Sequence, residues 1–212
     1  MRLPTTAYTL MIVILTNACA DGSAQRLYHE PFEETGSWNL SVEQPGPDDL
    51  SPSGSSATAR IEGGQLQLSA WQDGPCTRAQ ARNELPLNSP RANGITWRFV
   101  FEISQQDHNA MGRSDVMIAS DNRDVRVSLS SFSVPPGPIR LEIDFNDTVT
   151  VRRGETPLGD TAFQLEESSE SASAVNLIAH GCSPDNWGSA ELTVEHLELW
   201  ELTDISMPLP EE

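Results

Sequence analysis

Residues 95–103 read ITWRFVFEI, the clearest alternating stretch of the chain. Its large apolar side chains recur at every second position, at Ile95, Trp97, Phe99, Phe101 and Ile103. Polar or smaller side chains fill the positions between them, at Thr96, Arg98, Val100 and Glu102. Successive side chains of a β-strand point to opposite faces, so this alternation predicts a half-buried strand.

The same alternation recurs along the chain, in QLQLSA (65–70), VRVSL (125–129) and IRLEIDF (139–145). Further strand candidates lie at 116–120, 148–153, 162–167, 173–180 and 190–202. In the last of these the apolar phase slips between Val194 and Leu197, which predicts a β-bulge or burial on both faces. Turn-forming Gly, Pro and Asp residues separate the runs, and no window has a helical stripe of useful length. The pattern predicts an all-β fold, a two-sheet antiparallel β-sandwich of the jelly-roll type.

The N-terminus has the layout of an export signal. Met1-Arg2 precedes an apolar run at 7–16, and Ala18-Cys19-Ala20 offers an A-x-A cleavage site. We expect a signal peptide over 1–20, one sandwich domain over 21–203 and a disordered acidic tail over 204–212. The alternative is a lipoprotein signal ending at 18 with lipidation of Cys19. The mature protein is then extracytoplasmic, either secreted or periplasmic, or lipid-anchored to the envelope.

The charge balance restricts the partners. The chain has 31 acidic and 13 basic residues, a formal net charge of -18, and every basic residue is arginine. Such a surface repels nucleic acid and anionic lipid headgroups. We therefore expect no nucleic-acid partner, and membrane contact only through a lipid anchor at Cys19.

Two cysteines, Cys76 and Cys182, remain after removal or lipidation of Cys19. An even number of cysteines in an exported chain predicts a disulfide. The bridge would close a loop of about 100 residues and contribute roughly 4–5 kcal/mol in the chain-entropy model.

The order of features resembles a known superfamily. PFEETGSWNLS (31–41) is followed by IEGGQLQLS (61–69), a long alternating strand, TVTVRRG (148–154) and a last strand near the C-terminus. Over residues 27–202 this pattern resembles the concanavalin A-like lectin/glucanase jelly roll, which includes laminin-G-like modules. The resemblance implies two curved antiparallel sheets with the chain ends on adjacent strands. Members of this superfamily bind sugars, cleave glycans or serve only in adhesion, so the fold leaves the function open.

The catalytic candidates are Glu142, Asp144 and Asp147, in LEIDFND. Laminarinase-type hydrolases carry a similar E-x-D-x-(x)-E strand with a nucleophile, a tuning Asp and an acid/base. Glu142 and Asp144 share one strand face, but Asp147 stands where the family pattern has Glu. The alternative interpretation is a solvated strand face followed by an Asn-Asp turn.

The binding candidates are two tryptophans, each five residues from a cysteine, with their polar neighbours: Trp71, Asp73, Asp185, Asn186 and Trp187. Sugar recognition combines aromatic faces with amide and carboxylate groups. The alternative is that each indole packs on the predicted disulfide. Trp38, Trp97 and Trp200 are predicted core residues.

No spacing of His and Cys predicts a zinc site, and we expect no cofactor. Calcium is the one cation that the resemblance allows, with candidates in two acidic loops at Asp48, Asp49, Asp121 and Asp124. The leading hypothesis is an exported, non-catalytic module that binds glycan or another extracellular polymer. The alternatives are a glycoside hydrolase or lyase using the carboxylate strand, and a purely structural envelope protein.

Overall fold

The computed structural model describes most of the chain beyond the N-terminal segment. The described residues are 24–33, 36–43, 54–73, 76–85, 87, 91–110, 112–129, 137–159, 161–167, 173–182, 187–204, 206 and 209. The expected signal peptide, Cys19 and the acidic pair Asp48-Asp49 lie outside these residues. No helix in the described ranges has the length and hydropathy that a membrane crossing requires.

The first of two sheets, sheet A, has eight strands. In spatial order they are β11 (Thr156–Pro157), β10 (Val149–Arg153), β9 (Ile139–Phe145), β6 (Thr96–Ala110), β14 (Trp187–Leu202), β4 (Gln65–Asp73) and β3 (Ser56–Glu62). The eighth, β1 (Ala24–Glu30), also pairs with β14. The two ends of the folded domain therefore lie on adjacent strands, as the resemblance implies.

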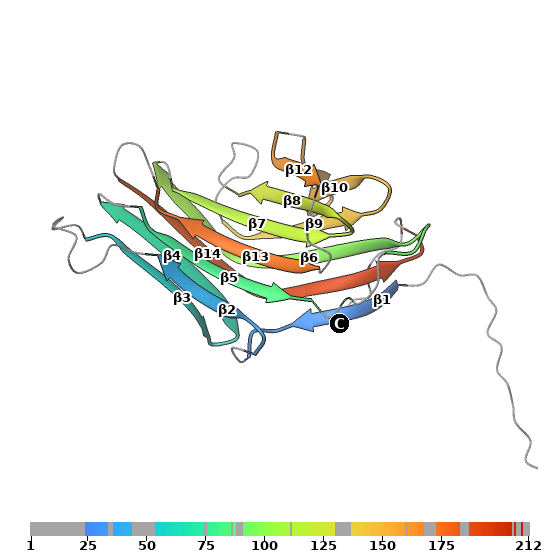
Figure 1. Ribbon diagram of the computed structural model, residues 1–212, viewed down its shortest axis with the longest axis horizontal. Coiled ribbons are helices and arrows are strands. Elements are labelled where there is room, and N and C mark those ends of the chain that lie inside the picture. The colour runs from blue at the N-terminus through green and yellow to red at the C-terminus, as the bar shows by residue number, and fades with distance from the viewer. Residues whose placement is uncertain are drawn as a thin grey trace, which may run out of the picture.

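The second sheet, sheet B, has six strands. Their order is β12 (Phe163–Glu167), β8 (Arg123–Ser128), β7 (Arg113–Ser120), β13 (Ala174–His180), β5 (Arg78–Glu84) and β2 (Asn39–Glu43). All strand pairs of both sheets are antiparallel. Figure 1 shows sheet B in front and sheet A behind it. The predicted all-β, two-sheet antiparallel sandwich is confirmed.

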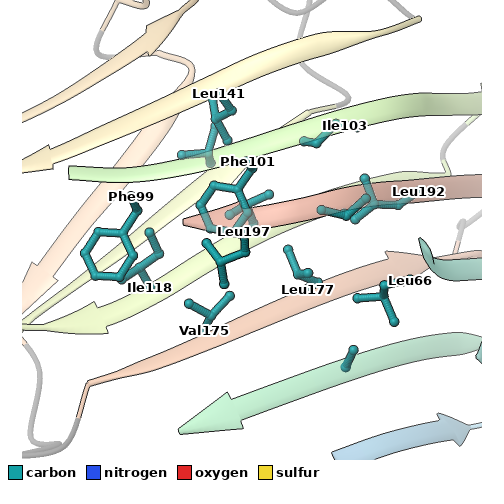
Figure 2. Packing of buried hydrophobic residues seen from close by; sticks show 14 of the residues in the cluster. Leu66, Phe99, Phe101, Ile103, Ile118, Leu141, Val175, Leu177, Leu192 and Leu197 are labelled. Atoms are coloured by element: carbon teal, nitrogen blue, oxygen red, sulfur yellow. The ribbon is translucent and has the colours of Figure 1, made fainter. Parts of the chain in front are cut away.

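The core fills the space between the two sheets (Figure 2). Phe99 and Phe101 of β6 lie there opposite Leu177 of β13, and all three are fully buried. Trp38 and Trp97 also belong to this core, whereas Trp200 is buried in a smaller cluster with Val100 and Leu202. The alternation of residues 95–103 therefore identified the core-facing side chains correctly.

The other face of β6 differs from the half-buried strand that we expected. Arg98 is only 4% exposed and Val100 is fully buried, although both point away from the core. Val100 is covered by Trp200 and Leu202 of β14 and, more loosely, by Leu209 of the tail. Arg98 is covered by partners in the same sheet, which form the ion network described below. Alternation indicates which residues share a face but not what covers that face.

The irregularities of the sheets have local causes. The register of β14 against β6 shifts at Val194, so the predicted bulge is confirmed. It separates the half of β14 that pairs with β4 from the half that pairs with β1. Between β7 and β8, Asp121 and Asn122 form a two-residue turn with φ of 52° and 58°. Positive φ at both positions is typical of the type I′ hairpin turn, and it sets the register of these two strands.

Candidate functional site

The exposed face of sheet B carries a row of side chains that crosses five strands. The strand register places Arg82 opposite Asn176, Asn176 opposite Met117, Met117 opposite Arg126 and Arg126 opposite Gln164. The row brings together segments far apart in the sequence, because β5 and β7 pair with opposite edges of β13.

A pocket of about 170 Å³ lies over this row, and we call it the sheet B groove. It is lined by Arg82, Met117, Ile118, Ala119, Asp124, Val125, Arg126, Gln164, Glu166, Ala174 and Asn176. Its polar groups stand on either side of the Met117 side chain, and Asp124 and Glu166 lie opposite each other at one margin. An apolar patch between amides and charged groups is the composition of a small-ligand site.

Asp115 lies next to this row and fixes the position of Arg126. Its side chain is fully buried, and its Oδ2 accepts hydrogen bonds from Arg126, with a distance of 3.2 Å from Nε. Arg113 forms a second ion pair with it, at 3.1 Å. Arg126 is therefore held in position by a buried carboxylate, and its side chain is preorganised for contact with a ligand.

Two buried oxygen acceptors on this face have no hydrogen-bond donor. They are Oδ1 of Asn176 and Oδ1 of Asp115, on neighbouring strands. A buried acceptor without a partner costs roughly 1–3 kcal/mol, and native structures keep few of them. Asn176 lines the groove, so a ligand that donates a hydroxyl hydrogen to it would remove its share of this penalty, whereas Asp115 is fully buried and does not line the groove.

His180 ends the same face of β13. Its Nε2 lies 3.7 Å from Oδ2 of Asp115. Burial lowers the pKa of His180 to about 4, and the positive charge of Arg113 acts in the same direction, while Asp115 opposes it. The imidazole is therefore neutral at neutral pH and provides one donor and one acceptor.

The predicted tryptophan site is described only in part. Trp71 is 41% exposed on the outer face of β4. The backbone of Trp187 pairs with Asp73, so the structure brings the two predicted segments together on adjacent strands. The side chain of Trp187 and both Asp185 and Asn186 lie outside the described residues.

Cys76 and Cys182 are free thiols in the structure, so the predicted disulfide is not formed in it. The two side chains are nevertheless neighbours. The pKa of Cys182 is raised to about 11, first by burial and second by a hydrogen bond with Cys76. The two cysteines are thus neighbours, as a bridge between them requires, and the disulfide itself stays a prediction.

Comparison with known proteins supports the fold. No family model matches the chain, and no curated protein matches it. Among solved structures, the catalytic domain of an endo-1,3-beta-glucanase (laminarinase) from Thermotoga petrophila RKU-1 superposes with a TM-score of 0.53 at 8% identity, covering 85% of this chain and 98% of that one. The chain has the concanavalin A-like jelly-roll fold.

Two other solved structures are similar to this jelly roll at lower TM-scores. Peanut lectin gives 0.48 at 9% identity, over 86% of this chain and 99% of the lectin. The CBM2 module of the evolved Dit of Lactobacillus casei BL23 phage J-1 gives 0.47 at 14% identity, over 88% and 99%. At these identities the likeness concerns the fold alone.

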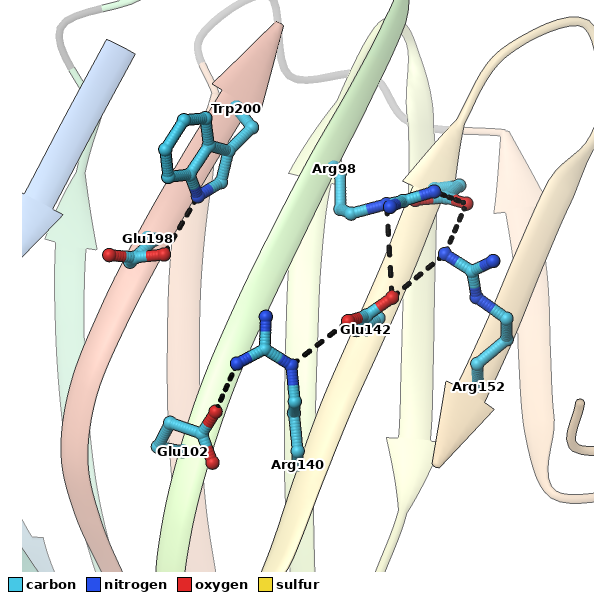
Figure 3. Close-up of polar contacts among 8 residues, drawn as sticks. Arg98, Glu102, Arg140, Glu142, Arg152, Glu198 and Trp200 are labelled. Atoms are coloured by element: carbon cyan, nitrogen blue, oxygen red, sulfur yellow. Dashed lines mark hydrogen bonds and ion pairs between the residues drawn. The ribbon is translucent and has the colours of Figure 1, made fainter. Parts of the chain in front are cut away.

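The carboxylate strand of the jelly roll forms an ion network on the outer face of sheet A (Figure 3). Asp144 is fully buried and accepts hydrogen bonds from Arg98, at 2.7 Å, and from Arg152, at 3.1 Å. Arg152 also donates to Glu142, at 2.8 Å. Arg140 joins Glu142 to Glu102. Three arginines thus neutralise three carboxylates.

This network differs from both interpretations of the carboxylate strand. A solvated face does not fit, because Arg98 and Asp144 are buried. In this structure arginines occupy the oxygens of Glu142 and Asp144, and the catalytic role of these residues stays a prediction. The side chain of Asp147 is 97% exposed, with only a 3.5 Å contact to Arg91. The apolar alternation placed these residues outside the core but could not reveal their cross-strand partners.

Of the calcium candidates, the structure describes Asp121 and Asp124. Asp121 accepts from Arg91 and Arg123, and Asp124 lines the sheet B groove. Among the residues that the structure describes, no group of three or more His, Cys, Asp or Glu side chains is placed to hold a metal ion.

The sheet B groove itself escaped the sequence analysis. Four of its five strands overlap predicted strand segments, whereas β5 (Arg78–Glu84) was not predicted, and the order of strands in a sheet cannot be read from alternation. The one local signal was polar side chains between apolar ones, such as Asn176 in AVNLIAH, and every half-buried strand shows that signal.

Proposed function

We propose that this chain is an extracytoplasmic, non-catalytic module that binds a polysaccharide or another cell-surface polymer in the sheet B groove. The mature protein is secreted or periplasmic, or attached to the envelope through a lipid on Cys19. No bound cofactor is needed, and calcium is the one cation whose effect is worth measuring. In an oxidising compartment, Cys76 and Cys182 form a disulfide.

The observation that carries the proposal is Oδ1 of Asn176, an acceptor without a donor on a residue that lines the groove. Sugar hydroxyls are donors as well as acceptors, so a glycan supplies what this face lacks. Arg82 and Gln164 at the two ends of the row add side-chain donors, and Met117 offers an apolar contact for the CH groups of a sugar ring.

The test is retention of the purified, oxidised domain on a panel of insoluble and gel-embedded polysaccharides, with calcium and with a chelator. We expect retention on at least one polymer, and at least a tenfold loss of affinity in Asn176→Leu, since one good hydrogen bond is worth about 1.4 kcal/mol. Asn176→Leu should fold at least as stably as the native protein, because it removes a buried acceptor without a partner.

The matched control is Gln25→Leu, the same kind of change at an exposed position of β1 in sheet A. It should bind like the native protein. Equal affinity of Asn176→Leu and the native protein would rule out the groove, and failure of retention on every polymer would favour the structural envelope protein. Release of new reducing ends during the same incubation would point instead to the hydrolase alternative.

A further inference from the structure

We infer that the outer face of sheet A carries a second binding surface, for a neutral polysaccharide, formed by the indole of Trp71 and a polar groove beside it. The sheet A groove, as we call it, lies on the outer face of sheet A, and sheet B forms the opposite layer of the sandwich (Figure 1). The inference does not depend on the function proposed for sheet B.

Trp71 is unusual among the outward residues of β4. The others are Gln65, Gln67, Ser69 and Asp73, all polar, whereas Trp71 leaves 41% of a large apolar side chain in water. Burying an indole is among the strongest apolar contributions that a side chain can make. The exposed ring is therefore a feature that the fold itself does not require.

The ring is held in place on both sides and at its edge. Trp71 pairs with Ser56 of β3 and with Ser189 of β14, so it stands between two small hydroxyl residues. Gly54 packs against the indole, since a Cβ at that position would lie 2.6 Å from its Cζ3 atom. A larger residue at 54 would have to displace the ring. The glycine thus allows close backbone contact that orients the indole.

The sheet A groove begins two residues away on the same face, at Ser69. It has a volume of about 420 Å³, and its lining includes Thr58, Gln65, Gln67, Ser69, Glu191 and Thr193. Thr58 and Ser69 share a hydrogen bond of 2.7 Å across the strands. Arg60 donates to Gln67 at 2.9 Å. These contacts fix hydroxyl and amide groups in a row that continues from the indole.

The side chains on the outer face of sheet A favour one class of ligand. The lining of the sheet A groove is mostly hydroxyls and amides, with Arg60, Glu191 and Leu68 as the exceptions, so an apolar peptide or a lipid chain would leave polar groups unpaired. Glu191 in the groove, Asp73 beside Trp71 and the net charge of -18 disfavour nucleic acids and acidic polymers. A neutral sugar chain places CH groups on the indole and hydroxyls against the hydroxyl and amide groups. Two such surfaces on opposite faces would let one module cross-link two polymer strands.

Trp71→Ala tests this surface on gels containing a soluble neutral glucan, with laminarin as the first probe. We expect at least a tenfold loss of retention under conditions where urea unfolding shows the variant to be folded, since the indole is only 41% exposed and its removal also costs some packing. Val42→Ala is the matched control, since Val42 is also an exposed large hydrophobic residue, at 44%, on β2 of sheet B. The native protein should also show a laminarin-dependent change in tryptophan fluorescence that Trp71→Ala lacks.

The outcomes separate the two surfaces. Loss of retention in Trp71→Ala together with an unaffected Asn176→Leu would support sheet A alone, and the reverse would support sheet B alone. Trp71→Ala that binds laminarin and a second neutral glucan as tightly as the native protein overturns the inference. A fluorescence response that persists in Trp71→Ala overturns it as well.

Discussion

Arg98→Met is expected to lower the free energy of unfolding by about 3–5 kcal/mol, the usual effect of breaking a buried ion pair. Asp144 is fully buried, and Arg98 provides two of its hydrogen bonds, at 2.7 Å and 3.2 Å. Arg152 remains as a partner but also serves Glu142. The Asp144 carboxylate would thus stay buried but lose most of the hydrogen bonds that offset the cost of burying its charge. Urea unfolding followed by far-UV circular dichroism measures the change.

The double variant Arg98→Met/Asp144→Leu separates the ion pair from simple packing. Replacing both charges with apolar groups of similar size is often neutral or stabilising, so the double variant should regain most of the lost stability. Arg60→Met is the control, because Arg60 and Glu62 pair at the surface with side chains 61% and 68% exposed. It should change stability by less than about 1 kcal/mol. If the double variant were no more stable than Arg98→Met, the unpaired charge of Asp144 would not be the cause of the lost stability.

Oxidation should link Cys76 to Cys182 and raise stability by about 4–5 kcal/mol in the chain-entropy model. The amide of Gly181 donates to the carbonyl of Thr77 at 3.0 Å, which continues the β5–β13 register past Arg78 and His180. One step further, Cys76 stands opposite Cys182 at a non-hydrogen-bonded position. Cα atoms at such positions lie about 4.5 Å apart, within the range that disulfides span.

Oxidised glutathione is the oxidant for this experiment, since it accepts the two electrons and two protons that the thiols release. Thiol titration should then find neither cysteine reactive, and urea unfolding should occur at higher urea than for the reduced protein. Cys76→Ser should show no such difference between the two conditions. Two titratable thiols after prolonged oxidation would contradict the proposed bridge.

The sequence predicted the core better than the surface. Alternation in residues 95–103 identified Phe99 and Phe101 as core residues, because burial on one face imposes a period of two. The phase slip near Val194 correctly indicated a bulge for the same reason. Arg98 shows the limit of this signal. It was assigned to a solvated face, yet its partner Asp144 comes from a different strand, and local pattern carries no information on cross-strand pairing.

The candidate sites also differ in how far the sequence could reveal them. Trp71 could be singled out because a tryptophan near a turn and a cysteine is locally conspicuous, and the structure leaves it exposed. Asn176 and Arg126 could not, because they are ordinary polar residues until β13 and β7 pair and bring them to one row. The lack of donors for Asn176 and Asp115 is a property of the assembled sheet, so only the structure reveals it.

Glycan binding in the sheet B groove is tested most directly by an NMR titration of the isotopically labelled native domain with oligosaccharides of the polymer that retains it. If the sheet B groove binds glycan, the side-chain amide of Asn176 and the backbone amides of Met117, Arg126 and Gln164 should shift together with one dissociation constant. Saturation of the protein with none of these four signals moving would contradict the claim, wherever else the spectrum changed.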